Sequence, residues 1–110
     1  MSSQLEIIAI ITPKAGKTDR VEELLTEVSE YVRSNEPDVL RYQVNREVNK
    51  KTGTEEIIML ETYKNKQALG AHGQSKVFKA FSKKLVEEDL VAGPPQLKFV
   101  KSVAGFSSRL

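Results

Sequence analysis

An α+β fold with the element order β-α-β-β-α-β is predicted from three observations on the sequence. Stretches rich in β-branched residues alternate with stretches in which apolar residues recur at helical spacing. Glycine and proline interrupt the chain between these stretches. The 110 residues provide material for one hydrophobic core. We therefore expect residues 1–110 to form a single domain, with about 106–110 as a flexible C-terminal tail.

The first two predicted elements are a strand and a long helix. The strand covers about residues 4–12, where isoleucine dominates, and Pro13 ends it. Apolar residues at helical spacing then predict the helix. Asp19 followed by Glu22 fits a capping box at its start, with Thr18 as the alternative N-cap. Asn35 and Pro37 are expected to stop it.

Two further strands joined by a polar loop come next. The second strand is predicted at about 39–47 and the third at about 56–63. The stretch 48–54 is polar and contains a glycine, as expected of a hairpin loop. One face of the second strand is expected to carry Leu40, Tyr42 and Val44. The other face is expected to carry Arg41, Gln43 and Asn45.

The last part of the chain predicts two short helices and a final strand. Asn65 can cap a helix that runs through Ala71, and Ser75 can cap the next one. The break at 93–95 precedes a strand at about 97–103. This order is the ferredoxin-like split βαβ plan, an antiparallel sheet with helices on one face.

Both faces of the two central predicted strands are apolar. One face would carry Ile7, Ala9, Ile11, Ile57 and Met59, and the other Ile8, Ile10, Ile58 and Leu60. Helices can cover only one face of such a sheet, and monomers rarely expose a large apolar patch. A homodimer packed sheet against sheet is therefore expected.

Composition and charge exclude several classes of protein. Apolar residues make up 39% and charged residues 29%, which is ordinary for a globular domain and argues against disorder, collagen or coiled coil. The net charge of +2 is spread along the chain, so neither nucleic acid nor a membrane is an expected partner. No secretory signal or membrane span is expected. The absence of cysteine removes disulfides, thiol catalysis and thiolate metal sites, and no metal site is predicted.

Three segments resemble the antibiotic biosynthesis monooxygenase (ABM) family of the dimeric α+β barrel superfamily. They are residues 8–17 (IAIITPKAGK), 36–44 (EPDVLRYQV) and 60–72 (LETYKNKQALGAH), the last continuing through Ser75 to Phe78 and Phe81. In that family the third pattern runs from an acidic residue and an aromatic, through Ala-Leu-x-x-His, to a serine and a phenylalanine. The resemblance implies a homodimeric, quinol monooxygenase-like protein that uses dioxygen without metal, flavin or other cofactor.

The sequence also departs from this family pattern. The family often has Gly or Cys where this chain has Val39, and Trp where the nearest aromatic here is Tyr63. The haem-degrading branch relies on a strand-one Asn, a Trp and a further His. This chain has no Asn in residues 4–12, no Trp and one His, so haem degradation is rejected.

The candidate site centres on His72, the single histidine. Its predicted position on the apolar side of a short helix suits a catalytic base. A packed or capping histidine beside Gly73 is the alternative. Substrate-binding candidates are Tyr42, Tyr63, Phe78, Phe81 and Asn45. The aromatics could equally be core residues, and Asn45 could equally be a rim or dimer contact.

The leading functional hypothesis is a cofactor-independent monooxygenase that acts on an electron-rich aromatic such as a quinol, anthrone or phenol. The alternative is a non-catalytic dimeric α+β barrel that binds a small molecule or serves in stress. A lyase or isomerase on the same scaffold is a third possibility. The first requires oxygen, the second consumes none, and the third turns over anaerobically.

Two short motifs point to other functions. Residues 15–18 (AGKT) mimic the end of a phosphate-binding loop, but Ile11 stands where the first glycine is needed, so a turn entering a capped helix is preferred. Ser108, Arg109 and Leu110 form a variant of the peroxisomal Ser-Lys-Leu address. A peroxisomal import receptor is thus an expected partner in a eukaryote, and cytoplasmic location is expected otherwise.

Overall fold

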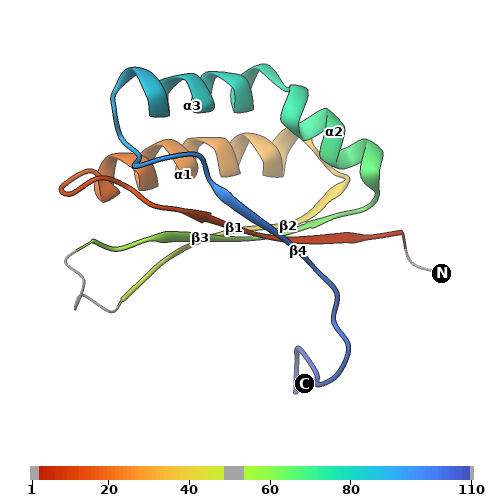
Figure 1. Cartoon of the computed structure of the whole chain (residues 1–110). Coiled ribbons are helices and arrows are strands. Elements are labelled where there is room, and N and C mark those ends of the chain that lie inside the picture. The colour runs from red at the N-terminus through yellow and green to blue at the C-terminus, as the bar shows by residue number, and fades with distance from the viewer. Residues whose placement is uncertain (1–2, 49–53, 110) are drawn as a thin grey trace.

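The computed structural model describes residues 3–48 and 54–109. Its elements follow the order β1 (Leu5–Ile11), α1 (Thr18–Asn35), β2 (Val39–Arg46), β3 (Ile57–Tyr63), α2 (Lys66–Gln74), α3 (Lys76–Glu87) and β4 (Gln96–Val100). The four strands form one sheet in the order β2-β3-β1-β4, with every neighbouring pair antiparallel. The three helices lie on one side of this sheet (Figure 1). This confirms the predicted α+β, ferredoxin-like fold, with the second helical segment divided in two.

The hydrophobic core lies between the sheet and the helices. Side chains alternate across a strand, and over residues 7–11 of β1 and 57–60 of β3 the residues facing the helices are buried while their neighbours are only partly covered. The helix-facing set contains Ile7, Ala9, Ile11, Ile57 and Met59, as predicted. From α1, Val21, Leu24, Leu25, Val28 and Val32 pack against it.

The N-terminus of α1 differs from the prediction. The N-cap is Lys17, without a side-chain cap hydrogen bond, so neither Asp19 nor Thr18 caps this helix. Thr18 is already the first helical residue, and its buried hydroxyl donates to the carbonyl oxygen of Glu55 at 3.2 Å. The Asp19 carboxylate pairs with Arg46. The turn before the helix is made by Gly16, whose φ of +77° is readily adopted only by glycine.

The first part of β2 also departs from the prediction. A β-bulge lies between Val39 and Arg41, so Leu40 has no partner on β3 and is 50% exposed. Val39 packs inward in its place. Tyr42 and Val44 pack against the core, as expected.

The two C-terminal helices begin as predicted. The Asn65 side chain accepts a hydrogen bond from the Ala68 amide, and the Ser75 hydroxyl accepts one from the Phe78 amide. The first of these helices, α2, continues to Gln74, so Gly73 is inside the helix and does not cap it. On α3, Phe81 and Leu85 are buried.

The strand β4 is shorter than predicted, ending at Val100, and the chain after it leaves on the side of the sheet opposite the helices (Figure 1). Val103 and Phe106 in this segment are exposed. Residues 49–53 of the predicted hairpin loop and Leu110 lie outside the described residues. Among the described residues, no helix is long and apolar enough to cross a membrane.

Candidate functional site

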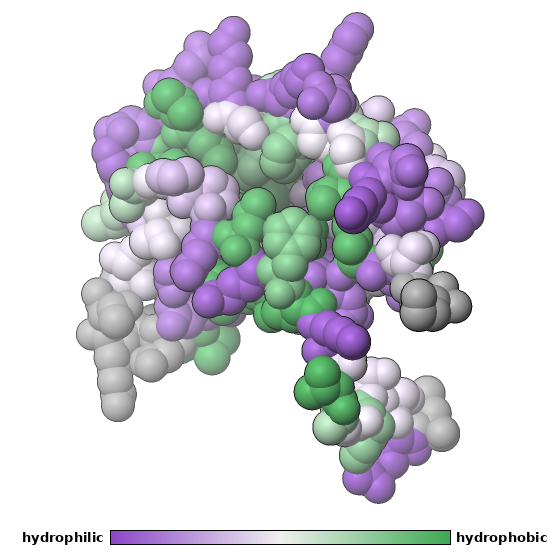
Figure 2. Space-filling model, turned by 45° about the vertical axis from the view of Figure 1, so that its right-hand side comes forward, coloured by the Kyte–Doolittle hydropathy of each residue, from purple (hydrophilic) through white to green (hydrophobic). Residues whose placement is uncertain are grey.

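A cavity of about 760 Å³ lies between the helix-facing side of the sheet and the helices α2 and α3. It is within the usual size range for small-molecule sites. Its apolar lining includes Ile7, Ala9, Leu25, Met59, Phe81 and Leu85. Figure 2 shows apolar side chains gathered around a hollow on this side of the molecule.

The cavity opens beside the edge strand β4. Helix α1 packs chiefly against β2 and α2 against β3, which leaves the helix-facing side of β4 uncovered. Leu97, on that side of β4, is 58% exposed and lines the cavity together with Pro94 and Pro95. The opening is therefore apolar.

His72 lies at the inner end of the cavity. The Asn65 cap starts α2 so that Ala68 and His72, one helical turn apart, both face inward. His72 is 4% exposed, and its Nδ1 atom lies 2.9 Å from Oε1 of Glu36. A carboxylate can only accept, so Nδ1 carries a hydrogen toward Glu36, and in the neutral imidazole Nε2 is the nitrogen with the lone pair. Because Glu36 follows the last residue of α1, this contact joins the end of α1 to α2.

Three aromatic rings surround the imidazole. The ring centroids of Tyr42, Tyr63 and Phe78 lie 5.1, 5.6 and 4.9 Å from that of His72. On α3, the ring centroid of Phe81 lies 6.1 Å from that of Phe78. All four aromatic residues predicted to bind substrate therefore line one cavity with His72.

Asn45 does not join this group. It pairs with Ile58, whose side chain lies on the face of the sheet away from the helices, and its amide donates to the Ile58 carbonyl at 3.1 Å. The period-two alternation of β2 places Asn45 with Gln43 and Arg41 on that outer face. Within this chain Asn45 is thus absent from the lining of the cavity, and its contact with a substrate stays a prediction.

Two carboxylates in the site were not predicted from the sequence. Glu36 appears in the sequence analysis only as the first residue of the family-like segment 36–44, and its contact with His72 depends on tertiary packing. Glu61 lines the cavity, and its Oε1 accepts the Tyr63 hydroxyl at 2.6 Å. A signal for Glu61 was present, because it continues the inward register of Ile57 and Met59.

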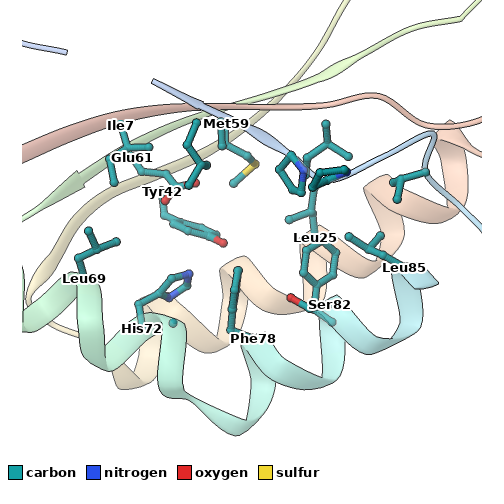
Figure 3. A pocket seen from close by; sticks show the side chains of 18 of the residues that line it. Ile7, Leu25, Tyr42, Met59, Glu61, Leu69, His72, Phe78, Ser82 and Leu85 are labelled. Carbon is teal, nitrogen blue, oxygen red and sulfur yellow. The ribbon is translucent and has the colours of Figure 1, made fainter. Parts of the chain in front are cut away.

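Burial sets the protonation preferences in the site. It raises the pKa values of the Tyr42 and Tyr63 hydroxyls, so both stay neutral and can donate hydrogen bonds. It also raises the pKa of the Glu61 carboxyl, against the opposing effects of the Tyr63 hydrogen bond and of His72. The Tyr42 hydroxyl points into the cavity (Figure 3) and has no hydrogen-bond partner among residues 3–48 and 54–109.

The site combines an apolar chamber with one polar end. The described lining contains neither lysine nor arginine, so an anionic ligand would find no cation there. The polar end offers a lone pair on His72, a donor on Tyr42 and a carboxyl group on Glu61. In the described part of the chain, no three His, Asp or Glu side chains are arranged to hold a metal ion. These features fit an uncharged, mainly apolar molecule with a hydroxyl or carbonyl group at one end.

The fold and the cavity define a ferredoxin-like α+β domain with an apolar chamber between its sheet and its helices. The family model for antibiotic biosynthesis monooxygenase matches residues 5–84. The chain belongs to this family, whose fold typically forms a dimeric α+β barrel.

Solved structures share this fold. A protein from Caulobacter crescentus described as a candidate antibiotic biosynthesis monooxygenase is 25% identical with a TM-score of 0.77, over 94% of this chain and 92% of that chain. A similarly described protein from Nitrosomonas europaea is 17% identical with a TM-score of 0.80, over 94% and 93%. PA3566 from Pseudomonas aeruginosa is 24% identical with a TM-score of 0.79, over 94% and 98%. No curated protein matches the chain significantly.

Proposed function

We propose that this protein is a cofactor-independent monooxygenase that acts on an electron-rich aromatic molecule such as a quinol, anthrone or related phenol. The observation that carries the proposal is the His72–Glu36 pair at the inner end of an apolar cavity. Glu36 fixes the imidazole orientation through Nδ1, which leaves Nε2 as the candidate base. The family assignment supports oxygen chemistry.

The proposed reaction begins with proton loss from the bound substrate to Nε2 of His72. The resulting anion transfers electrons to dioxygen, so the substrate itself is the reductant. The aromatic walls formed by Tyr42, Phe78 and Phe81 hold a flat ring and exclude water. The neutral Tyr42 hydroxyl can donate a hydrogen bond to the developing oxyanion.

An oxygen-electrode assay tests this function. We expect oxygen uptake above the buffer rate with at least one of hydroquinone, 1,4-naphthoquinol and 1,8-dihydroxyanthrone. Heat-denatured protein corrects for autoxidation, and an anaerobic arm detects a lyase or isomerase. Tight binding without oxygen uptake across the panel would instead support the non-catalytic binding protein.

The proposed functional unit is a homodimer formed through the outer face of the sheet. This face carries the partly covered side chains of Ile8, Ile10, Ile58 and Leu60 at its centre. Polar residues of β2 and β4 flank them, which resembles an interface with an apolar core and a polar rim. The segment after β4, with exposed Val103 and Phe106, projects to the same side (Figure 1).

For location in the cell, we propose that Ser108, Arg109 and Leu110 act as a peroxisomal address where they form the free carboxyl end of the chain in a eukaryote. A fluorescent protein fused to the N-terminus is then expected to enter peroxisomes. Deletion of Leu110 should leave the fusion diffuse. Identical distributions of the two fusions would refute the proposal.

A further inference from the structure

Glu61 lies opposite His72 at the inner end of the cavity. It comes from the sheet, and His72 comes from α2 on the helix side (Figure 3). The Tyr63 hydroxyl donates to Oε1 of Glu61 at 2.6 Å. The other oxygen, Oε2, has no hydrogen-bond partner among the residues that the structure describes. The carboxyl group is thus held in place by one oxygen, and the second is available to a ligand.

The surroundings of Glu61 suit a group that holds and releases a proton. Burial raises its pKa, and the neighbouring Tyr63 hydroxyl and His72 oppose this rise. The other titratable groups nearby are Tyr42 from β2 and Glu36 at the end of α1, which contact His72. Since Tyr63 contacts both Glu61 and His72, the two proton-handling groups belong to one connected cluster.

We propose that Glu61 is a catalytic acid that protonates the leaving oxygen when the O–O bond of a substrate peroxide breaks, while His72 acts as the base. This assignment rests on the monooxygenase function proposed above. It divides the chemistry between two groups that approach the substrate from opposite sides.

The steps balance for a substrate with an activated CH₂ group, written R₂CH₂ + O₂ → R₂C=O + H₂O. His72 removes one C–H proton, and the carbanion reduces dioxygen to form a C–O bond and a peroxide anion. That anion takes the proton back from His72 to give R₂CH–O–OH. His72 then removes the second C–H proton, the C=O bond forms, and the O–O bond breaks. The leaving hydroxide takes a proton from Glu61 and departs as water, and proton transfer from His72 to Glu61 restores both groups.

The test compares wild-type protein with Glu61→Gln, using 1,8-dihydroxyanthrone as substrate. Glutamine keeps the shape and the acceptor for Tyr63 but cannot give up a proton. We expect ketone formation to fall by about 10²-fold. Oxygen uptake should continue with release of peroxide, because the first proton transfer to His72 is intact. Anaerobic binding of 1,8-dihydroxyanthrone should change by less than about 2-fold.

Two further variants complete the experiment. Glu61→Asp retains an acid and should restore ketone formation without peroxide release. Glu56→Gln, in which the changed carboxylate accepts the Thr12 hydroxyl outside the cavity, should behave as wild type. Two results in Glu61→Gln would overturn the role of Glu61 but not the monooxygenase function. One is a full yield of ketone, and the other is a loss of oxygen uptake with no peroxide released. Absence of oxygen uptake by the wild-type protein would overturn the monooxygenase function as well.

Discussion

Replacement of His72 by glutamine is expected to lower turnover of an oxidisable phenol by about 10²- to 10⁴-fold, the usual contribution of a positioned general base. Glutamine can still donate a hydrogen bond to Glu36, so that buried carboxylate keeps its partner. It offers no basic nitrogen to the substrate. The loss should therefore appear in kcat, measured by oxygen uptake, with substrate affinity nearly unchanged.

A matched control separates this effect from damage to α2. Gln74 is exposed on the same helix, and Gln74→Ala should leave turnover at the wild-type level. Circular dichroism and thermal unfolding verify that both variants fold. Equal turnover in His72→Gln and wild-type protein would remove His72 from the mechanism and leave it as a packing residue, the alternative that its 4% exposure also permits.

Much of the fold could be predicted because the spacing of apolar residues, every second residue in a strand or at helical spacing in a helix, marks the side of that element that becomes buried. The inward and outward residues of β1 and β3, and the caps of α2 and α3, follow from local sequence alone. Leu40 was misplaced because a bulge adds one residue to β2, which alternation cannot reveal. The start of α1 was misplaced because Asp19 and Thr18 bond to distant partners, Arg46 and Glu55, instead of the helix end.

The candidate site was predictable where one element determines it. The aromatic residues and His72 converge because each lies on the inward side of its own strand or helix. The same rule places Asn45 outside the cavity. Asn45 and Tyr42 are an odd number of positions apart on β2, so their side chains point to opposite faces of the sheet. The partner of His72 was beyond this reasoning, since Glu36 precedes it by 36 residues and the two meet only when α1 and α2 pack.

Substitution of Leu60 by arginine is expected to convert the proposed homodimer into a monomer. Leu60 lies on the outer face of β3, between Ile8 of β1 and Gln43 of β2, near the middle of the sheet. In a lone subunit the arginine head group would reach water, so folding should be nearly unaffected. In a sheet-to-sheet dimer it would be buried without a carboxylate partner, at a cost of several kcal/mol. A cost of about 4 kcal/mol raises the dimer Kd by roughly 10³-fold.

Sedimentation equilibrium at micromolar concentration measures this change. Wild-type protein should have twice the chain mass of 12.3 kDa, and Leu60→Arg should have the mass of one chain. Val86→Arg is the matched control, because Val86 is 77% exposed on α3, on the helix side of the sheet, and should leave the dimer intact. The cavity lies on that helix side too, so the monomeric variant should still bind 1,8-dihydroxyanthrone. A dimeric Leu60→Arg protein would show that the subunits associate through another surface, and a monomeric wild-type protein would refute the dimer itself.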